Sequence, residues 1–194
     1  MNLFKSLSHR PFALLWSGQT ISRFGDSLYR IALAWWVLEK TGSAAQMGIV
    51  VFFSLTPMII FLLIGGVVVD RLPRLRVMLS SDLLSGLVIS VVAFLAYTGQ
   101  LELWHIYIAS LLFGFVEAFF FPAYSAAVPE ITPSEMLPSA NSLTDLSRQL
   151  TGMIGPSIGA VIVAVGGTPL AFALDALSFF TSAICVSIIR HIET

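Results

Sequence analysis

The chain has 194 residues, of which 57% are apolar and 11% are charged, and its formal net charge is -1. Soluble domains carry about 25% charged residues, so these side chains are too apolar for one water-soluble core. The near-neutral charge excludes a nucleic-acid-binding protein, which needs basic residues clustered over a broad face. The expected surroundings are therefore a lipid bilayer.

Six apolar segments divide the sequence. A bilayer core of about 30 Å needs about 20 helical residues, and turn residues or charges separate segments of that length. They are residues 12–38, 44–69, 77–97, 103–124, 140–165 and 170–189. We predict an all-α membrane protein in which residues 1–194 form one six-helix transmembrane domain.

Basic residues at the segment ends predict the orientation. The side that holds both termini carries six of them, and the other side carries only Lys40. The six are Lys5, Arg10, Arg71, Arg74, Arg76 and Arg190. Both termini are therefore expected in the cytoplasm.

Acidic residues repeat along the chain. Asp26 precedes Asp82 by 56 residues, and Glu117 precedes Asp175 by 58. Two three-helix repeats, as many transporters have, would produce this spacing, although chance is an alternative. Asp82 and Asp175 are expected in the first turns of their helices, where negative charge is favoured, so structural roles suffice for both.

The first segment contains Gln19, Arg23, Asp26 and Arg30, whose spacing places all four on one helical face. An ionised side chain in the middle of a bilayer costs about 3 kcal/mol, so this face must meet a partner helix or a watery cavity. Asp26 is expected to pair with Arg23 or Arg30. Another acid or an anionic substrate would neutralise the remaining positive charge.

Glu117 lies near the middle of the fourth segment, with aromatic residues on both sides, and is the natural candidate for that acid. A carboxyl group there can take up and release a proton as a cavity changes its exposure, which is the chemistry of a proton-coupled carrier. The alternative is a static ion pair that holds the first and fourth helices together. The Asp26 group has the same two interpretations.

Residues 126–139 contain a helix-start signal in which Thr132 and Glu135 flank Pro133. It predicts a capping box and a short interfacial helix.

The fifth segment then opens with a polar face of Asn141, Asp145 and Arg148. We expect a cytoplasmic extension of the helix, and the mouth of a cavity is the alternative.

The connection between the second and third segments combines a glycine, an acid and several arginines: Gly66, Asp70, Arg71, Arg74 and Arg76. Gly66 is expected to permit close helix approach. Asp70 ends a helix whose dipole repels it, so it should pair with Arg71, Arg74 or another helix's N-terminus, which suits a gate. The pattern resembles the loop signature of the major facilitator superfamily.

That resemblance has two departures, because the family usually has glycine where Pro73 stands and a basic residue where Leu75 stands.

A second motif lies in the fifth segment and consists of Gly152, Gly155, Pro156 and Gly159. Proline removes a backbone hydrogen bond, and glycines allow tight packing or bending. The motif resembles the fifth-helix signature of the superfamily's proton antiporters, which are mostly exporters. It departs from that signature at Thr151 and Ala160, where glycine is usual.

Residues 12–26, 129–133 and 140–142 resemble the macrolide-efflux and siderophore-export branch of the same superfamily. The resemblance implies the N-terminal six-helix half of a transporter with about twelve helices, and proton antiport across the bacterial cytoplasmic membrane. In that family, the counterpart of Asp70 pairs with a helix of the other half. The chain is therefore expected to be either a fragment or a half that dimerises or finds a partner.

The predicted function is export of amphiphilic small molecules, such as drugs or siderophores. Five aromatic residues offer broad apolar contact, or face lipid instead: Trp35, Trp36, Phe119, Phe120 and Phe121. Import of a small metabolite and a non-transporting scaffold are the rival functions. Cys185 is the single cysteine, and the three histidines lie at or beyond segment ends, so no metal site, cofactor or enzymatic activity is predicted.

Overall fold

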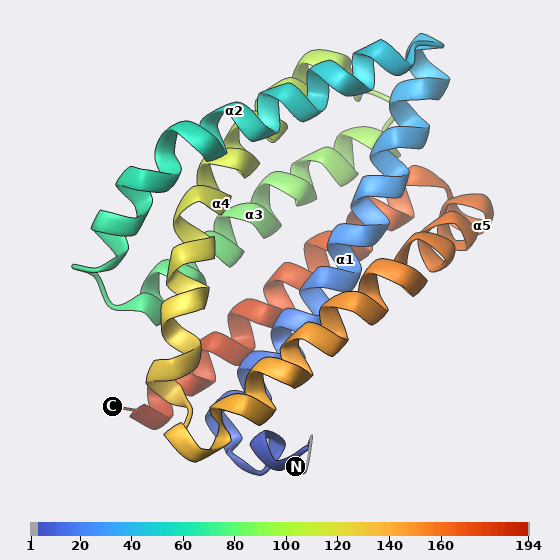
Figure 1. Ribbon diagram of the computed structural model, residues 1–194. Coiled ribbons are helices and arrows are strands. Elements are labelled where there is room, and N and C mark those ends of the chain that lie inside the picture. The colour runs from blue at the N-terminus through green and yellow to red at the C-terminus, as the bar shows by residue number, and fades with distance from the viewer. Residues whose placement is uncertain (1–3, 194) are drawn as a thin grey trace.

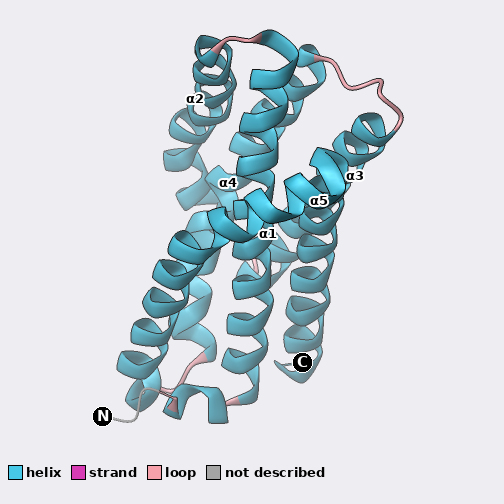
Figure 2. Cartoon of the chain, turned by 90° about the vertical axis from the view of Figure 1, so that its right-hand side faces the viewer, coloured by secondary structure: helices cyan, strands magenta, loops and turns pink. Residues whose placement is uncertain are grey.

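The computed structural model describes residues 4–193, which are helical apart from short turns (Figures 1 and 2). A 3-10 turn, η1, covers Lys5–Ser8, and another, η2, covers Ser134–Met136. The five longer helices are α1 (Arg10–Thr41), α2 (Ala44–Val69), α3 (Arg74–Tyr97), α4 (Leu103–Ile131) and α5 (Leu137–Glu193). The start of α1 and the end of α5 lie at the same end of the bundle (Figure 2).

Gly167 interrupts α5. Its backbone has φ 74° and ψ 176°, a conformation that glycine adopts without steric cost, and Pro169 follows it. Figure 1 shows the chain reversing direction there. We call residues 137–166 the first arm and residues 168–193 the second arm. The break lies between 165 and 170, where the sequence predicts a turn.

Four helical stretches in the described residues are long and apolar enough to cross a membrane. They are Ala44–Val69, Arg74–Tyr97, Leu103–Ile131 and Ser134–Ile192, the last of which contains both arms. α1, with three charged residues along its middle, is not among them. The all-helical fold is thus confirmed, while six membrane spans stay a prediction.

Small residues set how closely the helices pack. α1 lies between the two arms of α5, with Gly25 against Ser178 of the second arm and Gly155 of the first arm against Ser27. α2 packs on α4, and α3 packs on α4 and on the second arm. Glycine allows such approach because it has no side chain to separate two backbones.

Two hydrophobic clusters fill the interior, one towards each end of the bundle. The cluster near the termini contains Phe12 and Met78, and the other contains Leu33 and Ile89. Asp26 and Asp82 lie between these residues along α1 and α3. A polar layer therefore crosses the middle of the bundle.

The connection into the fifth helix differs from the prediction. α4 continues past residue 124 to Ile131, and η2 has no side-chain cap at its start. The Thr132 hydroxyl is buried without a hydrogen-bond partner, so the predicted capping box with Glu135 is wrong. A capping box is found instead at the start of α4, where the backbone N–H of Glu102 donates to His105 Nδ1 at 3.0 Å.

Candidate functional site

The charged face of α1 is directed into the bundle, but its members have different surroundings. Gln19 is buried and donates to Ser182 of the second arm at 2.7 Å. Arg23 is half-buried, with its guanidinium carbon 5.3 Å from the ring centre of Tyr124. Arg30 is exposed, and its Nη2 donates to Ser27 at 3.4 Å.

Asp26 forms no direct ion pair. Among residues 4–193, the salt bridges join Arg74 to Glu130 and Arg148 to Asp145. The predicted pairing of Asp26 with Arg23 or Arg30 is therefore wrong. Asp26 Oδ1 and Arg23 Nη1 are both buried without a hydrogen-bond partner, although the charges of both arginines still act on Asp26.

Glu117 in α4 is half-buried and also lacks an ion pair in the described residues. The charges that act on it belong to Asp26 and Asp82. The predicted ion pair between Glu117 and the first helix is thus absent, and Glu117 faces other acids instead. This arrangement does not provide the static strut that an ion pair would make.

Two cavities meet at Asp26 and Glu117. The first, which we call the α2 cavity, measures about 370 Å³ and lies between α1, α2 and α4. The second, the α3 cavity, measures about 250 Å³ and lies between α1, α3, α4 and the start of α5. Both acids line both cavities, so each carboxyl group lies where one cavity ends and the other begins.

The two cavities extend towards opposite ends of the bundle. The α2 cavity is bounded by Arg30, Leu33 and Met47, on the side of the α1–α2 turn. The α3 cavity is bounded by Gln19, Arg23 and Arg148, on the side of the chain ends. Asp26 and Glu117 therefore lie between a cavity on the side of the α1–α2 turn and a cavity on the side of the chain ends.

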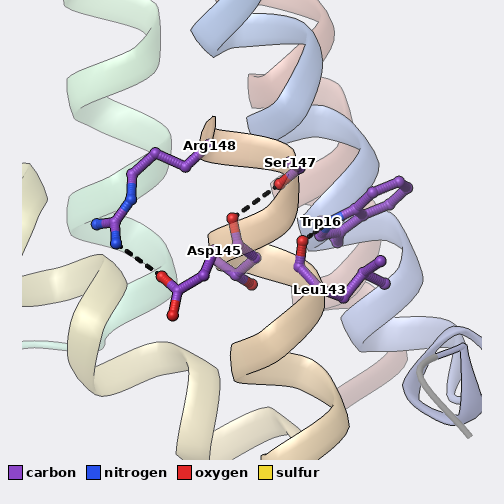
Figure 3. Close-up of polar contacts among 6 residues, drawn as sticks. Trp16, Leu143, Asp145, Ser147 and Arg148 are labelled. Atoms are coloured by element: carbon purple, nitrogen blue, oxygen red, sulfur yellow. Dashed lines mark hydrogen bonds and ion pairs between the residues drawn. The ribbon is translucent and has the colours of Figure 1, made fainter. Parts of the chain in front are cut away.

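Figure 3 shows Asp145 and Arg148, two of the three residues of the polar face near the start of α5. Arg148 Nη2 lies 2.7 Å from Asp145 Oδ1, and both side chains are exposed. Trp16 Nε1 of α1 donates to the Leu143 carbonyl at 3.4 Å and so joins the two helices. Arg148 also lines the α3 cavity, so this face forms part of the cavity mouth as well as the first turns of α5.

Asp82 and Asp175 are deeper than predicted. They lie well inside their helices and are 1% and 0% exposed, so helix N-termini do not stabilise them. Ser182 donates to Asp82 Oδ2 at 2.7 Å, and Ser178 lies 3.4 Å from Asp175 Oδ1. Their spacing from Asp26 and Glu117 in the sequence is the signal that places them in the same polar layer.

The loop after α2 differs from the prediction in its contacts. Asp70, Arg71 and Arg76 are exposed, while Arg74 pairs with Glu130 of α4 at 2.9 Å. Asp70 therefore has no ion pair with Arg71 or Arg74.

The glycine that permits close approach at the end of α2 is Gly65. A Cβ atom there would meet the Ala118 carbonyl of α4, whereas nothing lies within 4 Å of one at Gly66. The close approach predicted for Gly66 is thus made by its neighbour.

The glycine motif of the first arm divides in the same way. Gly155 and Gly159 are buried against Ser27 and Ile31 of α1, whereas Gly152 faces open space. Pro156, between them, is exposed. Two of the three glycines therefore allow the first arm to pack closely on α1.

The aromatic residues lie in different surroundings. Phe120 and Phe121 line the α3 cavity, Trp36 packs against the hydrophobic core, and Trp35 is 59% exposed. Tyr29 and Phe113, which the sequence did not single out, are stacked with ring centres 6.1 Å apart and line the α2 cavity.

Comparison with known proteins identifies the family. The model of the transmembrane secretion effector family, in the major facilitator superfamily, matches residues 2–193. This chain belongs to that family. The family is one of membrane transporters, and the chain is an integral membrane protein.

Curated relatives agree with this identification. The chain is 27% identical to macrolide efflux protein A of Streptococcus pyogenes over 92% of its length, and 30% identical to the multidrug efflux pump Tap of Mycolicibacterium fortuitum over 93%. It is 28% identical to the enterobactin exporter EntS of Escherichia coli O1:K1 over 93%. The chain spans 44%, 45% and 43% of these relatives, respectively.

Proposed function

We propose that α1 to α4 and the two arms of α5 are six membrane spans that form the N-terminal half of an exporter, built as two three-helix repeats. Both chain ends face the cytoplasm. The complete transporter moves amphiphilic small molecules outward across the bacterial cytoplasmic membrane, and each outward step is coupled to inward movement of protons.

The observation that carries this proposal is the position of Asp26 and Glu117. Both line the α2 cavity and the α3 cavity, and neither has a salt bridge in the described residues. A carboxyl group without a fixed cation can lose or gain a proton without breaking an ion pair. It is therefore suited to alternate between two sides of a membrane.

The proton step follows from this geometry. When the α2 cavity is open to the outside, Asp26 or Glu117 binds a proton there. When the α3 cavity opens to the cytoplasm, the same group releases it. Where that group is Asp26, Arg23 and Arg30 are the cations that act on the negative charge left behind. These arginines make the deprotonated state tolerable in the middle of the bundle.

The lining of the α2 cavity supports an amphiphilic substrate. Its wall is mainly apolar, with Met47, Met58 and Phe113 beside a few polar groups. Such a surface offers broad contact and little shape selection. The relatives are named for efflux of macrolides, of several drugs and of enterobactin, which fits substrates of this kind.

We further propose that a second six-helix half completes the transport path. The outer face of α2 presents large apolar residues, of which Ile59 and Leu63 are 67% and 82% exposed. The Gly66 and Asp70 side of the loop has no partner helix in the described residues. The second half is a further copy of this chain or a C-terminal half on the same or another polypeptide.

Transport in cells tests the function. Bacteria that lack their own exporters are given the chain together with its second half, and accumulation of ethidium and of radiolabelled erythromycin is followed with and without a protonophore. We expect lower accumulation than in vector controls, and loss of the difference with the protonophore. Asp26→Asn and Glu117→Gln should abolish export, whereas Asp145→Asn, which alters an exposed acid, should not.

The rival functions give different results. Greater accumulation of the probes with the chain than without it would indicate an importer. Equal accumulation in the wild type, in all variants and in the vector control would indicate a scaffold. Either result contradicts the proposal.

A further inference from the structure

Asp175 has no role in the transport step described above, because it lines neither the α2 cavity nor the α3 cavity. It lies in the second arm of α5, and its side chain is 0% exposed. Its Oδ2 has no hydrogen-bond partner, and it forms no salt bridge within residues 4–193. A buried carboxylate without a cation is strongly disfavoured, so the neutral acid is the form that this site accommodates.

The hydrogen bonds of Ser178 also favour the neutral form of Asp175. The Ser178 hydroxyl donates to the backbone carbonyl of Asp175 at 2.7 Å and lies 3.4 Å from Oδ1. One hydroxyl has a single proton to donate, and the shorter contact takes it. The carboxyl group thus has no strong donor that would compensate an ionised form.

The titratable groups around Asp175 come from two helices. α1 presents Asp26, Tyr29 and Arg30, each of which interacts electrostatically with Asp175. α3, which also packs against the second arm, carries Asp82. The single cation among them, Arg30, is exposed and points to Ser27. The balance of charge around Asp175 is therefore negative.

Asp26 is the neighbour through which a proton can leave. Next to it in the sequence, Gly25 is in contact with the second arm, and the place of its absent Cβ is taken by Asp175 Oδ1 and Ser178 Oγ. Asp26 Oδ1 and Asp175 Oδ2 are both buried without partners. Two carboxyl groups with unsatisfied oxygens thus flank one close helix contact, and only Asp26 reaches the cavities.

We propose that Asp175 is a further proton-binding residue, which holds a proton in the interior and exchanges it with Asp26 across the helix contact at Gly25. In the exchange, the O–H bond at Asp175 breaks, an O–H bond forms at Asp26, and Asp175 remains as a carboxylate until the proton returns. The use of this proton in transport rests on the proposed function, but the protonation of Asp175 does not. The described residues contain no group of three or more His, Cys, Asp or Glu side chains that could hold a metal ion.

Infrared spectroscopy of the purified full chain in phosphatidylcholine vesicles tests the proposal without a transport assay. A protonated carboxyl group gives a C=O stretching band separate from that of a carboxylate, and the band shifts in deuterated water. At neutral pH we expect such a band, and its intensity should fall in Asp175→Asn by the contribution of one carboxyl group. Asp145→Asn, which changes an exposed and paired acid, should leave the band in place.

The exchange with Asp26 has its own measurement. After transfer into deuterated water, the Asp175 band of the wild type should shift quickly. In Asp26→Asn, which offers an amide that cannot accept the proton, the shift should be slowed several-fold. Gly25→Ala should slow it too, because the new methyl group displaces Asp175, whereas Gly18→Ala perturbs the same pair of helices near Cys185 and should not.

Each outcome decides the matter. A protonated-carboxyl band of equal intensity in Asp175→Asn and in the wild type would overturn the proposal, because Asp175 would then be ionised. An exchange rate that is the same in Asp26→Asn and in the wild type would overturn the role of Asp26. If Asp175→Asn fails to fold by circular dichroism, Asp175→Glu replaces it, and the band should then shift in position rather than disappear.

Discussion

Ser182, in the second arm of α5, is hydrogen-bonded to Gln19 of α1 and to Asp82 of α3. Its hydroxyl donates to Asp82 Oδ2 of α3 at 2.7 Å and accepts from Gln19 Nε2 of α1 at 2.7 Å. All three side chains are nearly inaccessible. Hydrogen bonds rather than ion pairs therefore connect these three helices in the polar layer. Its acids are not neutralised by a fixed cation and can still bind and release protons.

Removal of this hydroxyl should be costly. Ser182→Ala leaves Gln19 and Asp82 buried without their shared partner, and we expect the free energy of unfolding to fall by about 1–3 kcal/mol. Unfolding by sodium dodecyl sulfate in mixed micelles, followed by circular dichroism, measures it. Ser90→Ala is the control, because Ser90 bonds only to its own helix at the Gly86 carbonyl. Equal losses of unfolding free energy in both variants would show that the hydrogen bonds of Ser182 to Gln19 and Asp82 add no stability beyond that of a hydrogen bond within one helix.

Gly65 and Gly66 should differ sharply although they are adjacent. Gly65→Val places a side chain against the Ala118 carbonyl of α4, whereas Gly66→Val meets open space. Overpacking of this kind costs about 1–3 kcal/mol, so Gly65→Val should lower the midpoint of thermal unfolding in detergent and Gly66→Val should not. The reverse order would mean that α2 packs on α4 through another face.

The first arm offers a similar pair. Gly155→Val collides with Ser27 of α1, and Gly152→Val has nothing within 4 Å. We expect only Gly155→Val to be destabilised, by about 1–3 kcal/mol, in the same unfolding assay. Gly155→Ala should show a smaller loss of the same sign. A loss confined to Gly152→Val would contradict the packing of the first arm on α1.

A second half should increase the protein mass that is measured in nanodiscs. One chain has a mass of 21.1 kDa, and light scattering in nanodiscs, corrected for lipid, should give about twice that value for a preparation that transports, if a second copy completes the path. Ile59→Arg and Leu63→Arg, on the exposed face of α2, should return the mass to one chain. An active preparation with the mass of a single chain would contradict the need for a partner.

Much of the fold could be predicted from the sequence because lipid imposes simple rules. The apolar segment 44–69 coincides with α2, and the turn between the fifth and sixth segments is found at Gly167. The predicted fourth segment ends at residue 124, yet α4 continues through Pro129 to Ile131. Proline within a helix can be tolerated where neighbouring helices support the backbone.

The candidate site could be predicted only in part. Charge in an apolar segment singles out Arg23, Asp26 and Glu117 because such residues are expensive in a bilayer. Their partners depend on how helices rotate about their axes, which one sequence does not specify. For the same reason, Asp82 and Asp175 were assigned to helix starts, although they are buried in the polar layer.

Proton movement in vesicles tests the central claim most directly. The chain is reconstituted into liposomes that contain a pH-sensitive dye, at equal pH on both sides, and ethidium is added outside. Exchange of entering ethidium for lumenal protons should make the lumen alkaline, and Asp26→Asn and Glu117→Gln should abolish the change while Asp145→Asn retains it. Entry of ethidium without alkalinisation, or with acidification, would contradict proton antiport at Asp26 and Glu117.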